Sequence, residues 1–475
     1  MHKRNEKITD KETIQNILLY YASYSLCGIS REALELAKDL EAGEFAFFMN
    51  ELFDKWTAAG AEAKKRWVIY ASSIHGGEDI ITKLQRQIPE WVKESRGEMA
   101  AEAVRALALN PSPRALLVVD DMSRSIRHRQ VRNAAVKALD FAAEQLGINR
   151  EELADRIVPD LGFNDNLHRT FDYGTRRFQV VLTPALEVEV YDQNGKRLKN
   201  LPAPGKTDDQ VRAAAAYEEY KRMKKEMKSV VASQRGRLEY ALAVGREWSA
   251  EAWRELFVRN PLMHQFAIGL IWGVYEKDQL IQSFRYMEDG SFNTQNEEEY
   301  KLPEQASIGL VHPLELPEEL KAVWRQQLAD YEIIQPFAQI DRAVYHVAEE
   351  EAEQKGLKRY DGCRINAFSL DRKMTELGWR RGPVQEGGWF FAYYREDTSL
   401  DMGVEMHFSG RPIEQGNETA RLQEARFYQV GAIERRGSVY DEMDEERACF
   451  LKDVPPRYFS EIVLQLAEVA ASDEA

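Results

Sequence analysis

Apolar side chains recur at helical spacing along the first third of the chain, from about residue 10 to residue 160. Short polar turns such as CGIS, AAG, HGGED and NPSP separate the apolar runs. An apolar period of three to four residues is typical of amphipathic helices. The clearest run, from about residue 98 to residue 147, predicts three helices, with Val104 and Leu107 on the first, Leu116 on the second, and Val131 and Leu139 on the third. We therefore predict that this part of the chain is entirely helical.

One of these helical segments has the character of a repeat. VRNAAVKAL, with a proline-containing turn before it, is similar to the helix pairs of HEAT-type solenoids. In such solenoids a pair buries its apolar face only against a neighbouring pair. We predict a solenoid-like helical domain over residues 1–163. Such a stack either presents a surface to a partner or is an ordinary helical domain, and the pattern favours neither.

After this helical part the apolar period changes from helical to alternating. Phe178, Val180 and Leu182, and then Val188 and Val190, fall on every second position, which is typical of half-buried strands. The Asn-Gly pair in YDQNGKR is a strong signal for a tight turn between two strands. We predict a small β meander and a linker, LPAPGKTDDQ, over residues 164–206.

The remainder, residues 207–475, has a mixed pattern that predicts an α+β domain. A long helix is expected from about residue 208 to residue 244, followed by a hairpin formed by LIWGVYEKD and LIQSFRYMEDG. SIGLVHPLEL predicts a buried strand, PEELKAVWRQQLADY a helix, GGWFFAYYRED with SLDMGVEMHFSG a late hairpin, and PPRYFSEIVLQLAEVAA a final amphipathic helix. The predicted fold class is α+β, with a HEAT-like all-helical N-terminal part and a mixed C-terminal domain.

Composition and charge limit the kinds of partner that the chain can have. The 475 residues are 44% hydrophobic, enough for more than one core, and the net charge is -15. Such an acidic chain is not attracted as a whole to nucleic acid or to anionic membranes, so only a local basic face would bind a phosphate polymer. The polar start of the chain lacks the apolar run of a signal peptide, and no stretch approaches the ~18 apolar residues of a membrane helix. We therefore expect a cytoplasmic protein without a membrane partner.

Cysteines and histidines give no metal-binding pattern. Cys27, Cys363 and Cys449 stand alone, which fits a reducing compartment and small buried side chains. The eight histidines form no HExxH or HxxxH pair. His407, in the strand GVEMHFSG, either faces a cleft or is half exposed. There is no GxxxxGK[ST] loop and no GxGxxG turn, and we expect neither a metal nor a cofactor.

The predicted helix at 208–244 carries the strongest local charge. At 3.6 residues per turn its basic residues fall within an arc of roughly 100°, beside an apolar face that carries Met223 and Met227. The basic residues are Lys221, Lys224, Lys225, Lys228 and Arg235. A second basic cluster consists of Arg124, Arg127, His128, Arg129 and Arg132. These residues are either a nucleic-acid-binding stripe that follows phosphates or a solvated helix face balanced by nearby glutamates.

Several separated segments of the second half make the chain recognisable. They are NPLM, LIWGVYE, FRYMEDGSF, IGLVHPLELP, DYEIIQPFAQIDR, LGWRRG and DVPPRYFSEIV. In this order they resemble a bacterial domain of unknown function in the C-terminal part of large proteins similar to the molybdate metabolism regulator. The resemblance covers roughly residues 100 to 475. It implies no catalytic residue and no molybdate site. Members sometimes carry a nucleic-acid-associated WGR domain, but IWGVY lacks the WGR signature.

The stretch from His312 to Arg342 is the candidate catalytic region. His312 follows an apolar strand, and Asp330, Asp341 and Arg342 are close to it in sequence, so a histidine with a carboxylate partner would act as a general base. In the structural interpretation, His312 instead makes a buried hydrogen bond and fixes the corner at which HP ends the strand. No G-x-S-x-G or Cys-His motif supplies a nucleophile.

Three hypotheses follow from these patterns. The leading one is a bacterial interaction or regulatory protein that binds a protein partner through its helical surface, with nucleic acid as a further partner of the basic helix. The alternative is a nucleotide- or nucleic-acid-directed enzyme with a site around His312. In the third, the chain is one module of a larger assembly.

Overall fold

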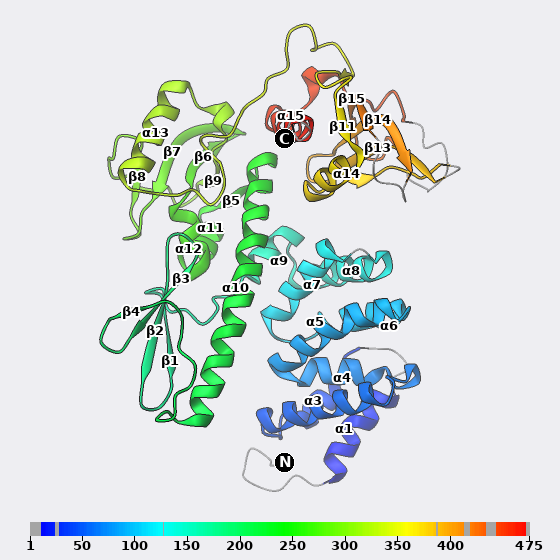
Figure 1. Cartoon of the computed structure of the whole chain (residues 1–475), viewed down its shortest axis with the longest axis vertical. Helices are drawn as coiled ribbons and strands as arrows, with labels where there is room; N and C mark the ends of the chain where they lie inside the picture. Colours follow the sequence, from blue (N-terminus) through cyan, green and yellow to red (C-terminus); the bar gives the residue numbers. More distant parts are fainter. Residues whose placement is uncertain are drawn as a thin grey trace. The chain divides into compact units, whose positions relative to one another are not determined.

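The computed structural model describes residues 11–23, 28–126, 128–385, 388–412, 419–433 and 443–471 (Figure 1). Its contacts divide the chain into two compact units. The first consists of Met1–Leu182, Val188–Ser233 and Arg259–Met263, and the second of Thr183–Glu187, Gln234–Val258 and His264–Ala475. The predicted fold class is confirmed, because a helical region is followed by sheets and helices. The division groups the β meander and most of the long helix with the helical region, whereas the sequence pattern placed boundaries at residues 164 and 207.

The first unit begins with a run of helices that pack on their neighbours in the chain (Figure 1). They are α1 (Lys11–Ser23), α2 (Arg31–Ala37), α3 (Ala42–Ala58), α4 (Trp67–His75), α5 (Gly77–Lys93), α6 (Gly97–Leu107), α7 (Pro113–Ser125), α8 (Arg129–Leu146) and α9 (Arg150–Arg156), with a 3-10 turn η1 (Ala63–Lys65). The sequence explains their ends. Ser112 caps α7 with Pro113 at its first position, and α8 stops at Gly147, whose φ of 66° suits glycine. The predicted apolar faces are buried, with Val104, Leu107 and Val131 at 0% exposure.

A four-stranded antiparallel sheet follows the helices, as the alternating pattern predicted. Its strands, in the order β1-β2-β3-β4, are β1 (His168–Asp172), β2 (Arg177–Leu182), β3 (Val188–Asp192) and β4 (Arg197–Leu198). Phe178, Val180 and Val190 are buried. The turn between β3 and β4 contains Gly195 at a φ of 77°, the left-handed conformation that an Asn-Gly turn requires.

The predicted long helix is α10 (Gln210–Val244), which has 35 residues. Its apolar face is buried as expected, since Met223, Met227 and Val230 are each less than 5% exposed. In the first unit this face packs on the meander, where Tyr220 lies edge-on against Phe171 with ring centroids 5.6 Å apart. The buried apolar face leaves the opposite face of α10 to carry the charged residues.

The second unit contains a five-stranded antiparallel sheet in the order β5-β9-β6-β7-β8. The strands are β5 (Glu247–Ser249), β6 (Ile271–Glu276), β7 (Gln279–Tyr286), β8 (Phe292–Thr294) and β9 (Ser307–Leu310). The helices of this part are α11 (Ala250–Trp253), a π-helical turn η2 (Arg254–Val258), α12 (Pro261–Ile268), a 3-10 turn η3 (Pro313–Glu315) and α13 (Glu318–Asp330). Trp253 and Trp272 meet edge to face in its core at 5.3 Å, and Trp324 of α13 is fully buried beside Ile271 and Ile340. The predicted hairpin, buried strand and helix are all confirmed.

A second antiparallel sheet of the same unit has the order β10-β15-β14-β13-β12, with β11 also paired to β15. The strands are β10 (Gly356–Leu357), β11 (Arg364–Asn366), β12 (Arg380–Arg381), β13 (Trp389–Asp397), β14 (Met402–Pro412) and β15 (Thr419–Gln429). Helices α14 (Ala367–Glu376) and α15 (Pro456–Ala470), with a 3-10 turn η4 (Leu451–Asp453), complete its apolar core. The late hairpin and the final amphipathic helix were predicted correctly. None of the helices in the described part of the chain is long and apolar enough to cross a membrane.

Candidate functional site

His312 forms a buried corner of the fold. It follows β9 and caps η3, and its Nδ1 accepts a hydrogen bond from the Leu314 backbone N–H at 3.1 Å. Glu315 closes the corner by accepting from the His312 backbone N–H at 3.1 Å. The side chain is 0% exposed, and burial is the main cause that lowers its pKa. The ring is therefore neutral, with its proton on Nε2.

The partner of that proton is Glu461, on α15. Its Oε1 lies 3.2 Å from His312 Nε2. Arg342 approaches the same carboxylate with two donors, Nε at 2.6 Å from Oε1 and Nη2 at 2.7 Å from Oε2. Burial alone would raise the pKa of Glu461, but the hydrogen bonds from His312 and Arg342 more than offset it, and the pKa is lowered. Glu461 is thus an ionised, buried carboxylate whose oxygens are already bonded.

A second polar group next to the corner also ties α15 to the five-stranded sheet. Arg457 donates from Nε to Glu315 Oε1 at 2.8 Å and from Nη2 to the Tyr275 hydroxyl at 2.8 Å. Tyr275 in turn donates to Glu315 Oε2 at 2.8 Å. Burial raises the pKa of Tyr275, so its hydroxyl stays protonated. These contacts join residues far apart in the sequence and hold the corner in one arrangement.

The four catalytic candidates do not gather at one point. His312 and Arg342 meet through Glu461, whereas Asp330 is exposed and accepts a hydrogen bond from an exposed glutamine of its own helix. Asp341 is also exposed and pairs with Arg325 at 2.6 Å. Glu461 carries no local sequence signal that would pair it with His312, because 149 residues separate the two. The candidates therefore divide into a buried ion-pair network and two surface carboxylates.

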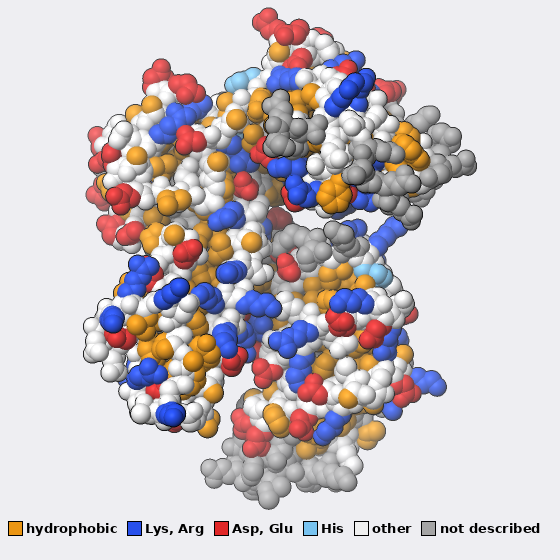
Figure 2. All heavy atoms as spheres, viewed as in Figure 1, with side chains coloured by type: hydrophobic (Ala, Val, Ile, Leu, Met, Phe, Trp, Pro, Cys, Tyr) orange, Lys and Arg blue, Asp and Glu red, His pale blue; other side chains and the backbone are white. Residues whose placement is uncertain are grey.

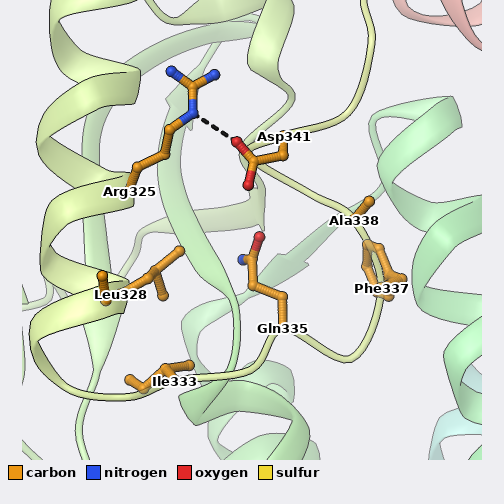
Figure 3. Close-up of a pocket in the computed structure, with 8 residues that line it drawn as sticks. Arg325, Leu328, Ile333, Gln335, Phe337, Ala338 and Asp341 are labelled. Atoms are coloured by element: carbon orange, nitrogen blue, oxygen red, sulfur yellow. Dashed lines mark hydrogen bonds and ion pairs between the residues drawn. The ribbon is translucent and has the colours of Figure 1, made fainter.

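A hollow of about 370 Å³ lies between α13 and the segment that follows it (Figure 3). Arg325 and Asp341 face each other across it, and the amide of Gln335 lies below them. Gln335 is held by its neighbours, since Nε2 donates to the Gly269 carbonyl at 3.3 Å and Oε1 accepts from the Ile340 N–H at 3.1 Å. Among the described lining residues only Arg325 and Asp341 are ionisable, and they neutralise each other. The hollow therefore has no free general base or nucleophile.

The segment after α13 is pinned to the sheet mainly by one glutamine. Gln339 is 0% exposed. Its Oε1 accepts from the Ile271 N–H at 2.9 Å, and its Nε2 donates to the Ile271 carbonyl at 2.7 Å and to the Val311 carbonyl at 3.0 Å. The side chain thus satisfies backbone groups of β6 and of the chain after β9 as a neighbouring strand would. The aromatic and polar residues of this stretch are accordingly explained by architecture.

The basic candidates lie on two separate helices. On α10, Lys225 and Lys228 are exposed and make no ion pair with the described part of the chain. Lys221 pairs with Glu218 at 2.8 Å, and Lys224 bonds the Asn200 side chain at 2.8 Å. Figure 2 shows Lys and Arg side chains gathered along the course of α10 and over the helices beside it. The cations without a partner give this helix a locally positive face.

The remaining basic candidates are placed less completely. Arg235, further along α10, is exposed. Arg129 is exposed at the start of α8, and Arg132, one turn later, is half-buried. Arg127 lies outside the described residues. No contact given by the structure joins this cluster to the basic residues of α10, so the two remain separate features.

Cysteines, histidines and carboxylates do not assemble into a metal site. No group of three or more His, Cys, Asp or Glu residues suited to a metal ion occurs within the described ranges. Cys363 and Cys449 are free and half-buried, while Cys27 falls outside the described residues. Burial raises the pKa of the Cys449 thiol, which makes it a poor nucleophile. His407 is half-exposed on β14, 3.6 Å from Glu405, which matches the second of the two interpretations of this histidine.

Comparison with known proteins places the chain near proteins whose function is also unknown. Residues 195–379 match the model of a domain of unknown function, DUF4132. The chain is 33% identical over 390 residues to "Uncharacterized protein YehI" of Escherichia coli (strain K12), a match that covers 80% of this chain. The matched region spans 32% of that relative's length. No solved structure matches the chain. These similarities support a relationship to a bacterial family of unknown function, and neither carries the name of the molybdate metabolism regulator.

Proposed function

We propose that the chain acts by non-covalent binding, as an interaction or regulatory protein. In this proposal the helical region over residues 1–163 is a HEAT-like stack that receives a protein partner. The positive face of α10, defined by Lys221, Lys224, Lys225 and Lys228, adds attraction to a polyanion. A cytoplasmic location is part of the proposal, because free Cys363 and Cys449 are typical of a reducing compartment. A relationship to large proteins similar to the molybdate metabolism regulator is also part of the proposal.

One observation supports this proposal most directly. Lys225 and Lys228 are exposed without an ion-pair partner in the described chain, while the ionisable groups around His312 are buried and bonded to each other. Solvated, unpaired cations are available to a polyanion, because binding them releases counterions from a phosphate backbone. The positive face on α10 is therefore free to engage a partner even though the whole chain is acidic.

The buried contacts of the His312 ring weigh against the enzymatic alternative. A general base must offer a ring nitrogen to a proton of the substrate. Nδ1 of His312 accepts from a backbone N–H, and Nε2 faces Glu461 in a buried contact. Catalysis would require at least one of these contacts to break and the fully buried ring to become accessible to a substrate.

A retention experiment tests the proposal. The tagged chain is incubated with bacterial lysate, with and without nuclease, and bound protein and nucleic acid are identified. A Lys225→Glu/Lys228→Glu variant reverses the positive face, and Lys301→Glu, at an exposed position outside both the helical region and α10, is the matched control. We expect the double variant to lose a partner that the control retains. A chain that holds neither protein nor nucleic acid beyond a tag-only control would overturn the proposal.

A further inference from the structure

A cavity of about 420 Å³ lies inside the first unit, where α7, the segment after α9, β1 and α10 come together. Each of these parts supplies one arginine to its lining: Arg114 from α7, Arg156 from the end of α9, Arg169 from β1 and Arg222 from α10. The α10 residues that line it, at positions 219, 222, 223 and 226, repeat at helical spacing and so share one face. The proposed binding through the helical region and the lysines of α10 does not use this ionic cavity.

Two of the four arginines are fully engaged in holding the walls. Arg114 donates to the Glu78 carbonyl at 3.2 Å and to Thr82 Oγ1 at 3.1 Å, and its Nε lies 3.2 Å from Glu226 Oε1. Arg169 bonds the Leu161 carbonyl and the carboxylate of Glu219. Only 14% of the Arg114 side chain and 17% of the Arg169 side chain remain exposed. These arginines fix the cavity in shape and have few donors left for a ligand.

The other two arginines keep donors for a ligand, since Arg222 makes only a long ion pair, with Asp79, and Arg156 makes none with the described residues. Arg156 is exposed and makes neither an ion pair nor a hydrogen bond with the described residues. Arg222 is 47% exposed, and its nearest acidic group, Asp79, is 3.7 Å away, which is too long for a hydrogen bond. Each guanidinium therefore keeps several donors in the planar geometry that matches a phosphate or carboxylate group.

The rest of the lining adds apolar surface and acceptors. Val158, Leu161 and Met223 are buried apolar residues of the wall. The Glu226 carboxylate is held in place by Arg114, and burial is the main cause that raises its pKa. Such a partly desolvated carboxylate is a good acceptor for a hydroxyl or amino group. A cavity of this volume is in the range of sites for small organic ligands.

We propose that this cavity binds a small organic anion, whose phosphate or carboxylate group is held jointly by Arg156 and Arg222 while its uncharged part rests on Val158, Leu161 and Met223. The ligand is of about nucleotide size, and its hydroxyl or amino groups donate to Glu226. A bound anion would tie α9 to α10 through the two arginines. The site is independent of Lys225 and Lys228, so the two proposals stand or fall separately.

The test uses the full chain and three probes: inorganic phosphate, adenosine monophosphate and citrate. Each is titrated by calorimetry and in thermal unfolding, with sodium chloride added to hold the ionic strength constant. The variants are Arg156→Gln, Arg222→Gln and their combination. Lys196→Gln, an exposed cation of the first unit outside both the cavity lining and α10, is the matched control. Circular dichroism confirms that each variant folds.

We expect at least one probe to bind and to raise the unfolding temperature. Each single variant should weaken binding about tenfold, equivalent to about 1.4 kcal/mol, and the control should bind as the parent does. If only adenosine monophosphate binds, the ligand is a phosphate ester with an organic part. If only citrate binds, the ligand is a polycarboxylate. The proposal is overturned if no probe exceeds the effect of sodium chloride, or if the double variant binds as tightly as the parent.

Discussion

Arg342 and Glu461 lie 119 residues apart in the chain and form a bidentate ion pair, with nitrogen–oxygen distances of 2.6 and 2.7 Å. Glu461 belongs to the helix that covers the six-stranded sheet, and Arg342 follows the segment pinned to the five-stranded sheet. Because His312 shares the same carboxylate, one acid connects three distant parts of the second unit. This contact makes the polar stretch from His312 to Arg342 part of a joint between two sheets.

Glu461→Gln should destabilise the second unit by about 3 kcal/mol, because it replaces the buried carboxylate shared by His312 and Arg342 with a neutral amide and leaves Arg342 with only the partly exposed Glu239, at 3.1 Å, as an ionised partner. The measurement is urea unfolding followed by circular dichroism. Glu353→Gln is the matched control, since Glu353 is 74% exposed and pairs with Lys452, itself 45% exposed, at the surface, where such pairs contribute about 1 kcal/mol or less. Equal losses in the two variants would mean that the buried pair is no more important than a surface one.

Stability should fall as the pH drops from about 6.5 to about 4, in part because of His75. Burial lowers the pKa of His75 to about 4, and its Nε2 lies 2.8 Å from the Tyr21 hydroxyl. In this window the unfolded chain binds a proton that the folded chain does not, which costs up to about 3 kcal/mol at the acidic end. Thermal unfolding at pH 7 and pH 5 should differ less in His75→Gln than in the parent. The exposed His346→Gln should keep the parent's difference.

If α10 contacts a nucleic acid, its lysines should set the salt dependence of binding. Removing one phosphate contact lowers the slope of log K against log salt by about 1. We therefore expect Lys225→Gln and Lys228→Gln each to reduce that slope in fluorescence anisotropy with labelled oligonucleotides. Lys301→Gln, at an exposed position outside both basic clusters, should leave it unchanged. If the parent and the three variants all have the same slope, the affinity comes from another surface.

Gln339→Met should destabilise the second unit by about 3 kcal/mol or more. Methionine fills a similar volume but removes the partners of the Ile271 N–H and the Val311 carbonyl, while the Ile271 carbonyl keeps only the Val311 N–H at 3.2 Å; an unsatisfied buried group costs about 1 to 3 kcal/mol. Chemical unfolding measures the loss. Gln326→Met, at an exposed position of α13, should change stability by about 0.5 kcal/mol or less. A neutral Gln339→Met would show that the segment is held by its apolar residues alone.

The elements of this fold could be predicted from the sequence because their signals are local. Helical periodicity identified the helical region and α10, and the Asn194–Gly195 pair located the turn between β3 and β4. The hairpin of β6 and β7 was predicted from two apolar runs separated by a short polar break. In each case the residues that determine the element lie within a few positions of each other.

The polar contacts could not be predicted in the same way. His312 was expected to make a buried hydrogen bond, but its acceptor, Glu461, is 149 residues away. The sequence placed Asp330 and Asp341 close to His312, and the fold directs both to the surface. Arg156 and Arg222 line one cavity although 66 positions separate them in the chain. Tertiary packing, which periodicity does not encode, decides which charges meet.

The position of α15 also bears on how the second unit is completed during synthesis. Until Glu461 has emerged from the ribosome, Arg342 and the His312 ring have no carboxylate to share, and the six-stranded sheet lacks the second of the two helices that complete its core. Chains under translation expose hydrophobic strands in this interval, when partly folded domains are most prone to aggregate. Nascent chains of this unit would therefore depend on chaperones until the last of its helices docks.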